Sequence, residues 1–388
     1  MIDKLIAYPI GEVKKKLVIA KAKTWFAAGL IKEDQWKGIQ AGYSSELFSP
    51  SIFMRVLLFI ATYFGLTTVL GPVILLVANQ SMATIRIVIF IVGAIILAFT
   101  DRSMIISKKH YKSGITEAGY YAGFSFIYFG LLGFDHSSAL VYWIIAMLLA
   151  SISTIRYMDL LSLLVATLCL TAILFLTFEP YLFILPFIII IVFAALFLLS
   201  QQIQKKVDYL LWEDHFILFD SLALLLVYLG GNYFVVRELS IEMMGMDLSS
   251  GEDIPGAFVF YGLTFITPIA YLVWGISQRS VLFIRMSLLA IALSIFTIKY
   301  YYSLAPLEVT MTVGGGLLIL ISLALIKYLK TSPYGFTREQ IVQGKWDNTD
   351  LVALVASQTL GPQDIEEPES VLRKGDGKFG GGGASGDF

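Results

Sequence analysis

The chain has 388 residues, a formal net charge of −1, 57% hydrophobic residues and only 15% charged residues. This balance gives no electrostatic reason to expect a nucleic-acid partner, and the single cysteine, Cys169, excludes an internal disulfide. The composition is instead typical of an integral membrane protein, because a membrane-spanning helix needs about 20 mostly apolar residues.

Residues 1–47 precede the apolar segments and predict a small helical segment on the cytoplasmic side. The stretch from Val13 to Trp25 has helical periodicity and many lysines; Gly29 is expected to end that helix, and Lys32 to begin a second one. The start of the chain has no signal-peptide pattern, so the first spanning helix is expected to direct insertion. The lysine-rich face has two interpretations, contact with anionic membrane lipid or exposure to water, and lipid contact is our hypothesis.

Ten apolar segments follow, each long enough to form a helix across the bilayer. They cover residues 52–78, 84–100, 115–133, 138–154, 158–178, 181–200, 215–236, 256–276, 280–298 and 306–329. Glycine runs at 230–231 and 314–316 are expected to allow close helix packing, with a helix bend as the alternative. The predicted fold class is all-α, a polytopic transmembrane helix bundle over residues 52–329.

The distribution of basic residues predicts the orientation of these helices. Lysine and arginine gather in alternate connections, those between segments 2–3, 4–5, 6–7 and 8–9. These basic residues are Arg102, Lys108, Lys109, Lys112, Arg156, Lys205, Lys206 and Arg279. Because basic loops stay inside, both termini are expected in the cytoplasm.

A few charged residues fall within the apolar segments, where each costs a few kcal/mol unless it is paired or hydrated. Asp220 and Arg285 are a hypothesised pair near the cytoplasmic side, and Lys299 and Glu308 a second pair toward the outside. These pairs have two interpretations. They either lock helices together, which we favour, or form the polar site of a secondary transporter.

The sequence contains no motif for catalysis or for binding a cofactor. A zinc-binding His-Glu-x-x-His, a glycine-rich phosphate loop and a Gly-x-Ser-x-Gly elbow are all missing. The three histidines, His110, His136 and His215, lie in or beside different connections and on opposite predicted sides of the membrane. We therefore expect no enzyme activity, no cofactor and no metal site.

The C-terminal region has two parts with different composition. Residues 330–360 predict a cytoplasmic amphipathic helical segment, which opens with a capping box at Thr337. Residues 361–388 predict a flexible, glycine-rich tail. Phe379 and the terminal Phe388 flank the glycine run, so the tail is either a plain spacer or a signal that docks a partner protein.

Two stretches resemble known proteins. Trp25, Gly29-Leu30-Ile31 and Asp34-Gln35 resemble the N-terminal helical segment of uncharacterised bacterial multi-pass membrane proteins. The ending from Phe379 to Gly386 is similar to the C-termini of TPM-domain membrane proteins, which close on tryptophan where this chain closes on Asp387-Phe388. Both resemblances imply the bacterial inner (cytoplasmic) membrane, and neither implies an activity.

The sequence therefore predicts a non-enzymatic component of a membrane complex. It would act through its cytoplasmic ends and through the C-terminal tail, which is expected to bind other membrane proteins. The alternative is a secondary transporter with a polar site near Asp220 and Arg285. No internal sequence repeat supports that alternative.

Overall fold

The structure is a computed structural model, and it describes residues 5–77, 79–133, 138–181, 183–244 and 253–301 together with scattered positions between 309 and 327. The described chain is helical, and its only β pairing is an isolated bridge between Phe48 and His110. The α-helices are α1 (Ile10–Ala27), α2 (Glu33–Gly42), α3 (Ile52–Val77), α4 (Met82–Phe99), α5 (Ile115–Leu132), α6 (Ala139–Tyr157), α7 (Leu160–Thr177), α8 (Leu185–Gln204), α9 (Tyr209–Gly231), α10 (Tyr233–Met244), α11 (Ala257–Ser277) and α12 (Val281–Tyr301). A π-helix, η2 (Thr100–Ser107), continues α4, and a 3₁₀ turn, η3 (Glu179–Tyr181), precedes α8.

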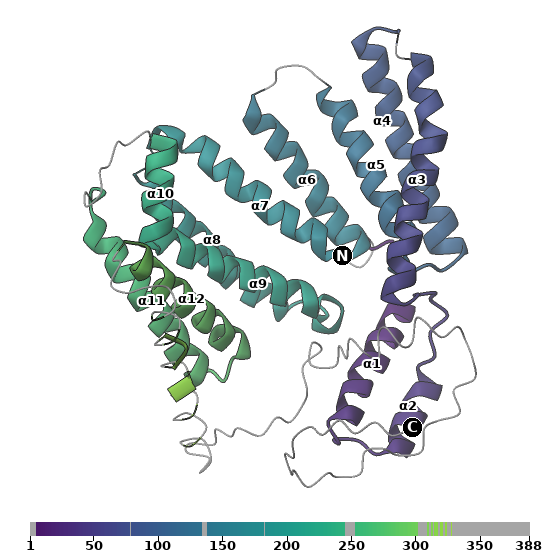
Figure 1. Ribbon diagram of the computed structural model, residues 1–388. Helices are drawn as coiled ribbons and strands as arrows, with labels where there is room; N and C mark the ends of the chain where they lie inside the picture. Colours follow the sequence, from purple (N-terminus) through teal and green to yellow (C-terminus); the bar gives the residue numbers. More distant parts are fainter. Residues whose placement is uncertain are drawn as a thin grey trace, which may run out of the picture. The chain divides into compact units, whose positions relative to one another are not determined.

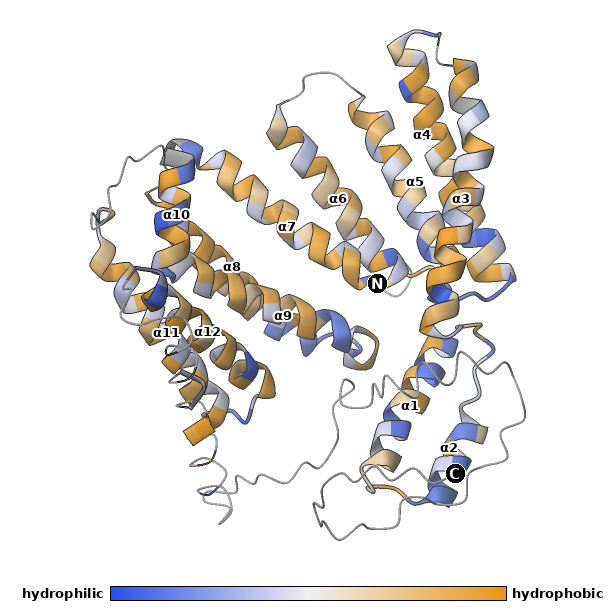
Figure 2. Cartoon of the chain, in the orientation of Figure 1, coloured by the Kyte–Doolittle hydropathy of each residue, from blue (hydrophilic) through white to orange (hydrophobic). Residues whose placement is uncertain are grey.

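The helices are those of a multi-pass membrane protein. Seven described helices are long and apolar enough to cross a membrane, or eight if the bent pair α9–α10 is one span. Figure 2 shows apolar residues along most of α3 to α8, α11 and α12, whereas polar residues gather on α1, α2 and the start of α9. Each of the first nine predicted segments overlaps an α-helix, in order α3 to α9, α11 and α12, and most of the tenth, 306–329, lies outside the described residues.

Three predicted spans differ notably from the structure, two in their boundaries and one in its apolar character. The second span does not end at residue 100, because η2 continues the helix to Ser107. The seventh does not run from 215 to 236: α9 begins at Tyr209 and ends at Gly231, and α10 follows at an angle of 70°. The third, α5, falls outside the seven apolar helices, since it contains Glu117 and several glycines and tyrosines.

Consecutive helices pack as antiparallel pairs, α4 with α5, α6 with α7, α8 with α9 and α11 with α12 (Figure 1). Helix α9 also packs against α1, α7, α10, α11 and α12. Its buried residues include Trp212, His215, Asp220 and Tyr228, so polar side chains recur along a helix that neighbours surround. Helix α9 therefore joins α1 to the helices of the second half of the bundle, α7, α8 and α10 to α12.

Glycines allow α4 and α5 to approach closely. A Cβ atom added to Gly93 of α4 would lie 2.7 Å from the carbonyl oxygen of Gly123 and 2.8 Å from the amide nitrogen of Ile127, both in α5. Gly123 in turn faces the side chain of Leu97. Small residues at such crossings let helix backbones meet, and this packing takes the place of a hydrophobic driving force inside lipid.

We predict that Gly93→Ala destabilises the protein, because the new methyl group meets backbone atoms that cannot move independently. The expected loss is about 1–3 kcal/mol, the range for overpacked cores. The matched control is Gly65→Ala in α3, where nothing lies within 4 Å of the added Cβ. The unfolding free energy in detergent should fall for the first variant and stay level or rise for the second; equal effects would contradict the predicted contact.

Candidate functional sites

The N-terminal helical hairpin, α1 with α2, is anchored at its base. Tyr8 and Val13 are buried in a core cluster that also contains Tyr157 of α6 and Trp212 of α9. The amide of Ala7 donates a hydrogen bond to the carbonyl oxygen of Arg156, at 2.8 Å. The start of the chain is thus packed against the ends of helices that the sequence places much later.

The lysines of α1 contact the protein itself. Lys14 pairs with Asp208 at 2.6 Å and Lys21 with Glu213 at 2.7 Å, both at the start of α9. Lys16 donates to the carbonyl oxygen of Leu47 at 3.1 Å. A further lysine, Lys15, together with the amide of Glu46, lowers the pKa of Glu12 to about 2 by donating to its carboxylate. Four of the five lysines of α1 therefore form ion pairs or hydrogen bonds within the chain: lysines 14, 15, 16 and 21.

The tip of the hairpin exposes apolar side chains. Gly29 has a φ of +71°, and the amide of Leu30 donates to the carbonyl oxygen of Trp25 at 2.9 Å, a Schellman turn that only glycine closes without strain. Trp25, Phe26 and Leu30 remain 40%, 39% and 47% exposed. Phe26 stacks on Trp36, at a ring-centre distance of 6.3 Å, and no residue of α2 is buried.

Three carboxylates lie at the end of the bundle that receives the hairpin, and all three are paired. Asp159 begins α7 and accepts from the amide of Ser162 at 2.7 Å and from the hydroxyls of Tyr120 and Tyr121, both at 2.9 Å. Arg156 and Tyr157 donate to Asp101 in η2, the tyrosine hydroxyl at 2.8 Å.

The third carboxylate, Glu117, is 5% exposed and pairs with Arg55 of α3 at 2.5 Å. Its other oxygen accepts from the amide of Gly114 and from the hydroxyl of Thr116, each at 2.7 Å. Gly114 has a φ of +87°, and a Cβ there would lie 2.0 Å from the carbonyl oxygen of Arg55, so only glycine fits. Because each carboxylate has donors on other helices or helix ends, this layer holds the helix ends together.

His215 differs from these carboxylates. It is 6% exposed and packs edge-on against Trp212, at a ring-centre distance of 5.0 Å. Neither ring nitrogen makes a hydrogen bond, although the backbone of Met158 lies beside the ring. The described residues contain no group of three histidine, cysteine or acidic side chains that could hold a metal ion.

Asp220 is the residue midway along α9, with eleven residues of the helix on either side. It is 3% exposed, and one carboxylate oxygen accepts from the amides of Gln201 and Gln204 in α8, both at 2.8 Å. The other oxygen is buried without a hydrogen bond. The structure does not bring Asp220 and Arg285 together: neutral amides from α8 take the place of the expected cation, and Arg285 is on an exposed position of α12.

The bend at the end of α9 is held by Asn232. Its side-chain amide donates to Tyr228 at 2.8 Å and to Thr297 of α12 at 3.1 Å, and its side-chain oxygen accepts from the amide of Val235, at the start of α10. The contact with Val235 satisfies a backbone amide that the break releases, and the other two tie the bend to side chains of α9 and α12. The 23 residues of α9 extend over roughly 34 Å at about 1.5 Å per residue, enough to cross the hydrocarbon core without α10.

Both interpretations of Gly230 and Gly231 therefore apply. A Cβ on Gly230 would lie 3.1 Å from the carbonyl oxygen of Pro186, and one on Gly231 the same distance from Leu263, so both glycines lie at close helix contacts. The helix also bends directly after them. In the tenth predicted span, a Cβ on Gly314 would meet only an ordinary contact, and those on 315 and 316 would meet nothing within 4 Å.

The remaining predicted site residues are only partly described. Lys299 is half-buried near the end of α12, but its expected partner Glu308 lies outside the described residues. Phe379, Phe388 and the segments 330–360 and 361–388 also lie outside them, as does His136. The structure thus leaves the Lys299–Glu308 pair and the tail as predictions.

The sequence analysis did not predict the layer of paired carboxylates formed by Asp101, Glu117 and Asp159, although one sequence signal pointed to Asp159. Asp159 directly precedes the long apolar run of α7, the position of a helix N-cap. Its pairing with Tyr120 and Tyr121 could not be deduced, because those residues are separated from it by a whole helical hairpin.

We predict that Asp159→Ala lowers the unfolding free energy by about 3 kcal/mol, since two buried tyrosine hydroxyls lose their acceptor and α7 loses its cap. Asp159→Asn should lose less, because an amide oxygen still accepts one hydrogen bond. The control is Asp34→Ala, at an exposed position of α2. Thermal unfolding of the purified variants measures the order of their stabilities. If Asp159→Ala were as stable as the control, the contacts of Asp159 would not stabilise the protein, and the prediction would be wrong.

Comparison with known proteins adds no relative. No protein-family model, no curated protein and no solved structure matches the chain. What the chain does is therefore inferred from its own side chains and their contacts.

Proposed function

We propose that the chain is a non-enzymatic component of a membrane complex in the bacterial inner membrane, and that the hairpin tip contacts its partner protein. The observation that carries this proposal is the contrast within the hairpin. Its base is fixed by buried Tyr8 and Val13, whereas its tip exposes Trp25, Phe26 and Leu30. A rigid support that presents aromatic and aliphatic anchors is the form of a protein-binding hot spot.

The charges of the hairpin favour a protein over a lipid surface. Attraction to anionic lipid relies on lysines that are free to face the headgroups. Lys14 and Lys21 are instead engaged by Asp208 and Glu213 of the chain itself. The partner we propose has an apolar groove for the tip and a polar rim.

We predict that a photoreactive p-benzoylphenylalanine at Phe26 forms one discrete protein adduct in native membranes. Leu30→Asp should reduce the adduct at least tenfold, because a carboxylate would be buried in the groove. Gln40, an exposed polar residue of α2, supplies both controls: the photoreactive residue at that position and Gln40→Asp. The captured protein, once purified, should bind the wild type at least tenfold more tightly than Leu30→Asp. Adducts to lipid alone, or equal binding, would overturn the proposal.

The C-terminal tail is proposed as a second contact with other membrane proteins. A chain that ends before Phe379 should lose partners that the tip variants keep. The two contacts are removed by different variants. A partner that is lost both with the shortened chain and with Leu30→Asp would therefore need both the tail and the hairpin tip.

A secondary transporter is the second candidate, and the position of Asp220 favours it. A carboxylate midway along a spanning helix, with one bare oxygen and no cation among its described contacts, can bind a proton or a transported cation. Against this candidate, the bend lies at the end of α9 and not in its middle.

We predict that dicyclohexylcarbodiimide, which reacts with protonated carboxyl groups inside membranes, labels Asp220 and not Glu117. Both carboxyls are buried, but Glu117 is covered by its ion pair with Arg55 and by two hydrogen bonds, whereas one oxygen of Asp220 is bare, which makes Glu117 the internal control. Mass spectrometry of the labelled peptides reads the result, and Asp220→Asn should abolish the α9 label. If Asp220 stays unlabelled in the folded protein, it holds no exchangeable proton, and the transporter candidate loses its site.

A further inference from the structure

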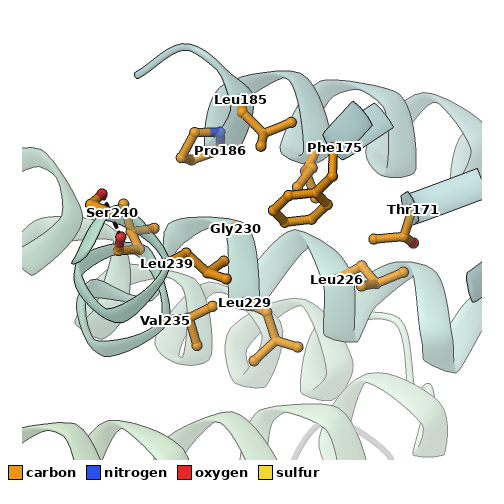
Figure 3. A pocket seen from close by; sticks show the side chains of 12 residues that line it. Thr171, Phe175, Leu185, Pro186, Leu226, Leu229, Gly230, Val235, Leu239 and Ser240 are labelled. Carbon is orange, nitrogen blue, oxygen red and sulfur yellow. Dashed lines mark hydrogen bonds between the residues drawn. The ribbon is translucent and has the colours of Figure 1, made fainter. Parts of the chain in front are cut away.

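An apolar cavity of about 150 Å³ lies at the elbow between α9 and α10 (Figure 3). Its walls come from four helices: Phe175 of α7, Leu185 and Ile189 of α8, Leu226 and Leu229 of α9, and Leu239 of α10. Figure 3 shows the cavity from close by, with Pro186 and Leu185 of α8 on one side and Leu239 of α10 on the other. The cavity is independent of the hairpin and of Asp220.

The side chains that line the cavity have no free hydrogen-bond donor for a ligand. The only polar side chains in its lining are Thr171 and Ser240. Thr171 donates to the carbonyl oxygen of Thr167 at 3.0 Å, and Ser240 to that of Val236 at 2.7 Å. Since both hydroxyl protons are used within their own helices, the lining selects for an apolar occupant.

Helix α10 covers the cavity with its apolar side and turns its charges elsewhere. The guanidinium of Arg237 lies 4.9 Å from the ring centre of Tyr301, and the Tyr301 hydroxyl donates to Glu238 at 2.7 Å. Val235 and Leu239 line the cavity. A short amphipathic helix at 70° to a spanning helix is the arrangement of a segment lying at the membrane surface.

The depth of the cavity follows from the same helices. Leu226 and Leu229 lie in the last turns of α9, and Leu185 and Ile189 in the first turns of α8. Beside them, Phe183 and Ile184 are half exposed, at 52% and 50%. The cavity therefore lies just inside one end of the spanning helices, where the hydrocarbon of one membrane leaflet begins.

We propose that this cavity binds one acyl chain of a membrane phospholipid, held under α10. The chain is recognised by shape and apolar contact alone. The headgroup takes no part, because the nearest cation in α10, Arg237, is engaged by Tyr301 and Glu238. Binding would fix α10 against α7 and α8, so the lipid acts as a structural ligand of the elbow.

The test uses the full chain in lipid nanodiscs that contain a phospholipid with a diazirine in its acyl chain. Mass spectrometry of the photolysed protein should find adducts on peptides that contain Leu226–Leu239 or Phe175–Ile189 at least fivefold above those on α3, whose residues are lipid-exposed. Labelling of the cavity should saturate as the probe fraction rises, whereas labelling of α3 should rise in proportion.

Leu239→Trp fills the cavity and should reduce its labelling at least fivefold, while Leu198→Trp on the exposed side of α8 should leave it unchanged. If Leu239→Trp fails to fold, the wild-type protein still tests the proposal, because only a specific site gives labelling that saturates as the probe fraction rises. Probes with ethanolamine and glycerol headgroups but the same chain should label equally. Cavity labelling that equals that of α3, or that depends on the headgroup, would overturn the proposal.

Discussion

The helices around α9 depend on one constraint: polar groups along α9 must find partners inside the protein, because hydrocarbon offers none. Each solution to this constraint brings in a different neighbour. Asp220 uses amides from α8, and Asn232 reaches Thr297 of α12. At its start, α9 supplies Asp208 and Glu213 to the lysines of α1. The partners of one helix thus fix the positions of three others.

The two ends of α9 solve the problem with different chemistry. Ion pairs such as Lys14–Asp208 form at the end that receives the hairpin, where both side chains are more than a third exposed and water still hydrates them. The other end uses only uncharged groups around Asn232, among them Tyr228, which is 1% exposed. Between these ends, two buried side chains depart from this pattern: Asp220 keeps one oxygen without a donor, and neither ring nitrogen of His215 makes a hydrogen bond. A buried polar group with incomplete partners is costly, and Asp220 is the one of the two that lies midway along the helix.

The sequence predicted the helices better than the contacts between them. The length of the apolar segments predicted the positions of nine helices, and Gly29 predicted the end of α1. Both signals are local, since each depends only on residues that are close in sequence. The partner of Asp220 was not predictable, since two charges of opposite sign meet only if both helices turn them inward, and rotation is set by packing. The glycines at 230 and 231 raised the same difficulty, because close approach and bending share one signal and the structure uses both.

The anchoring of the hairpin has a consequence for the order in which the protein is assembled. Tyr8 and Val13 are made before the surface that buries them, because that surface includes Leu211 and Trp212, about two hundred residues later in the chain. Until α9 is inserted, the base of the hairpin has no complete binding surface, and its apolar side chains stay accessible during synthesis. Helix α1 therefore docks only after α9 has been made, so a segment that is translated before the spanning helices is among the last to reach its final position.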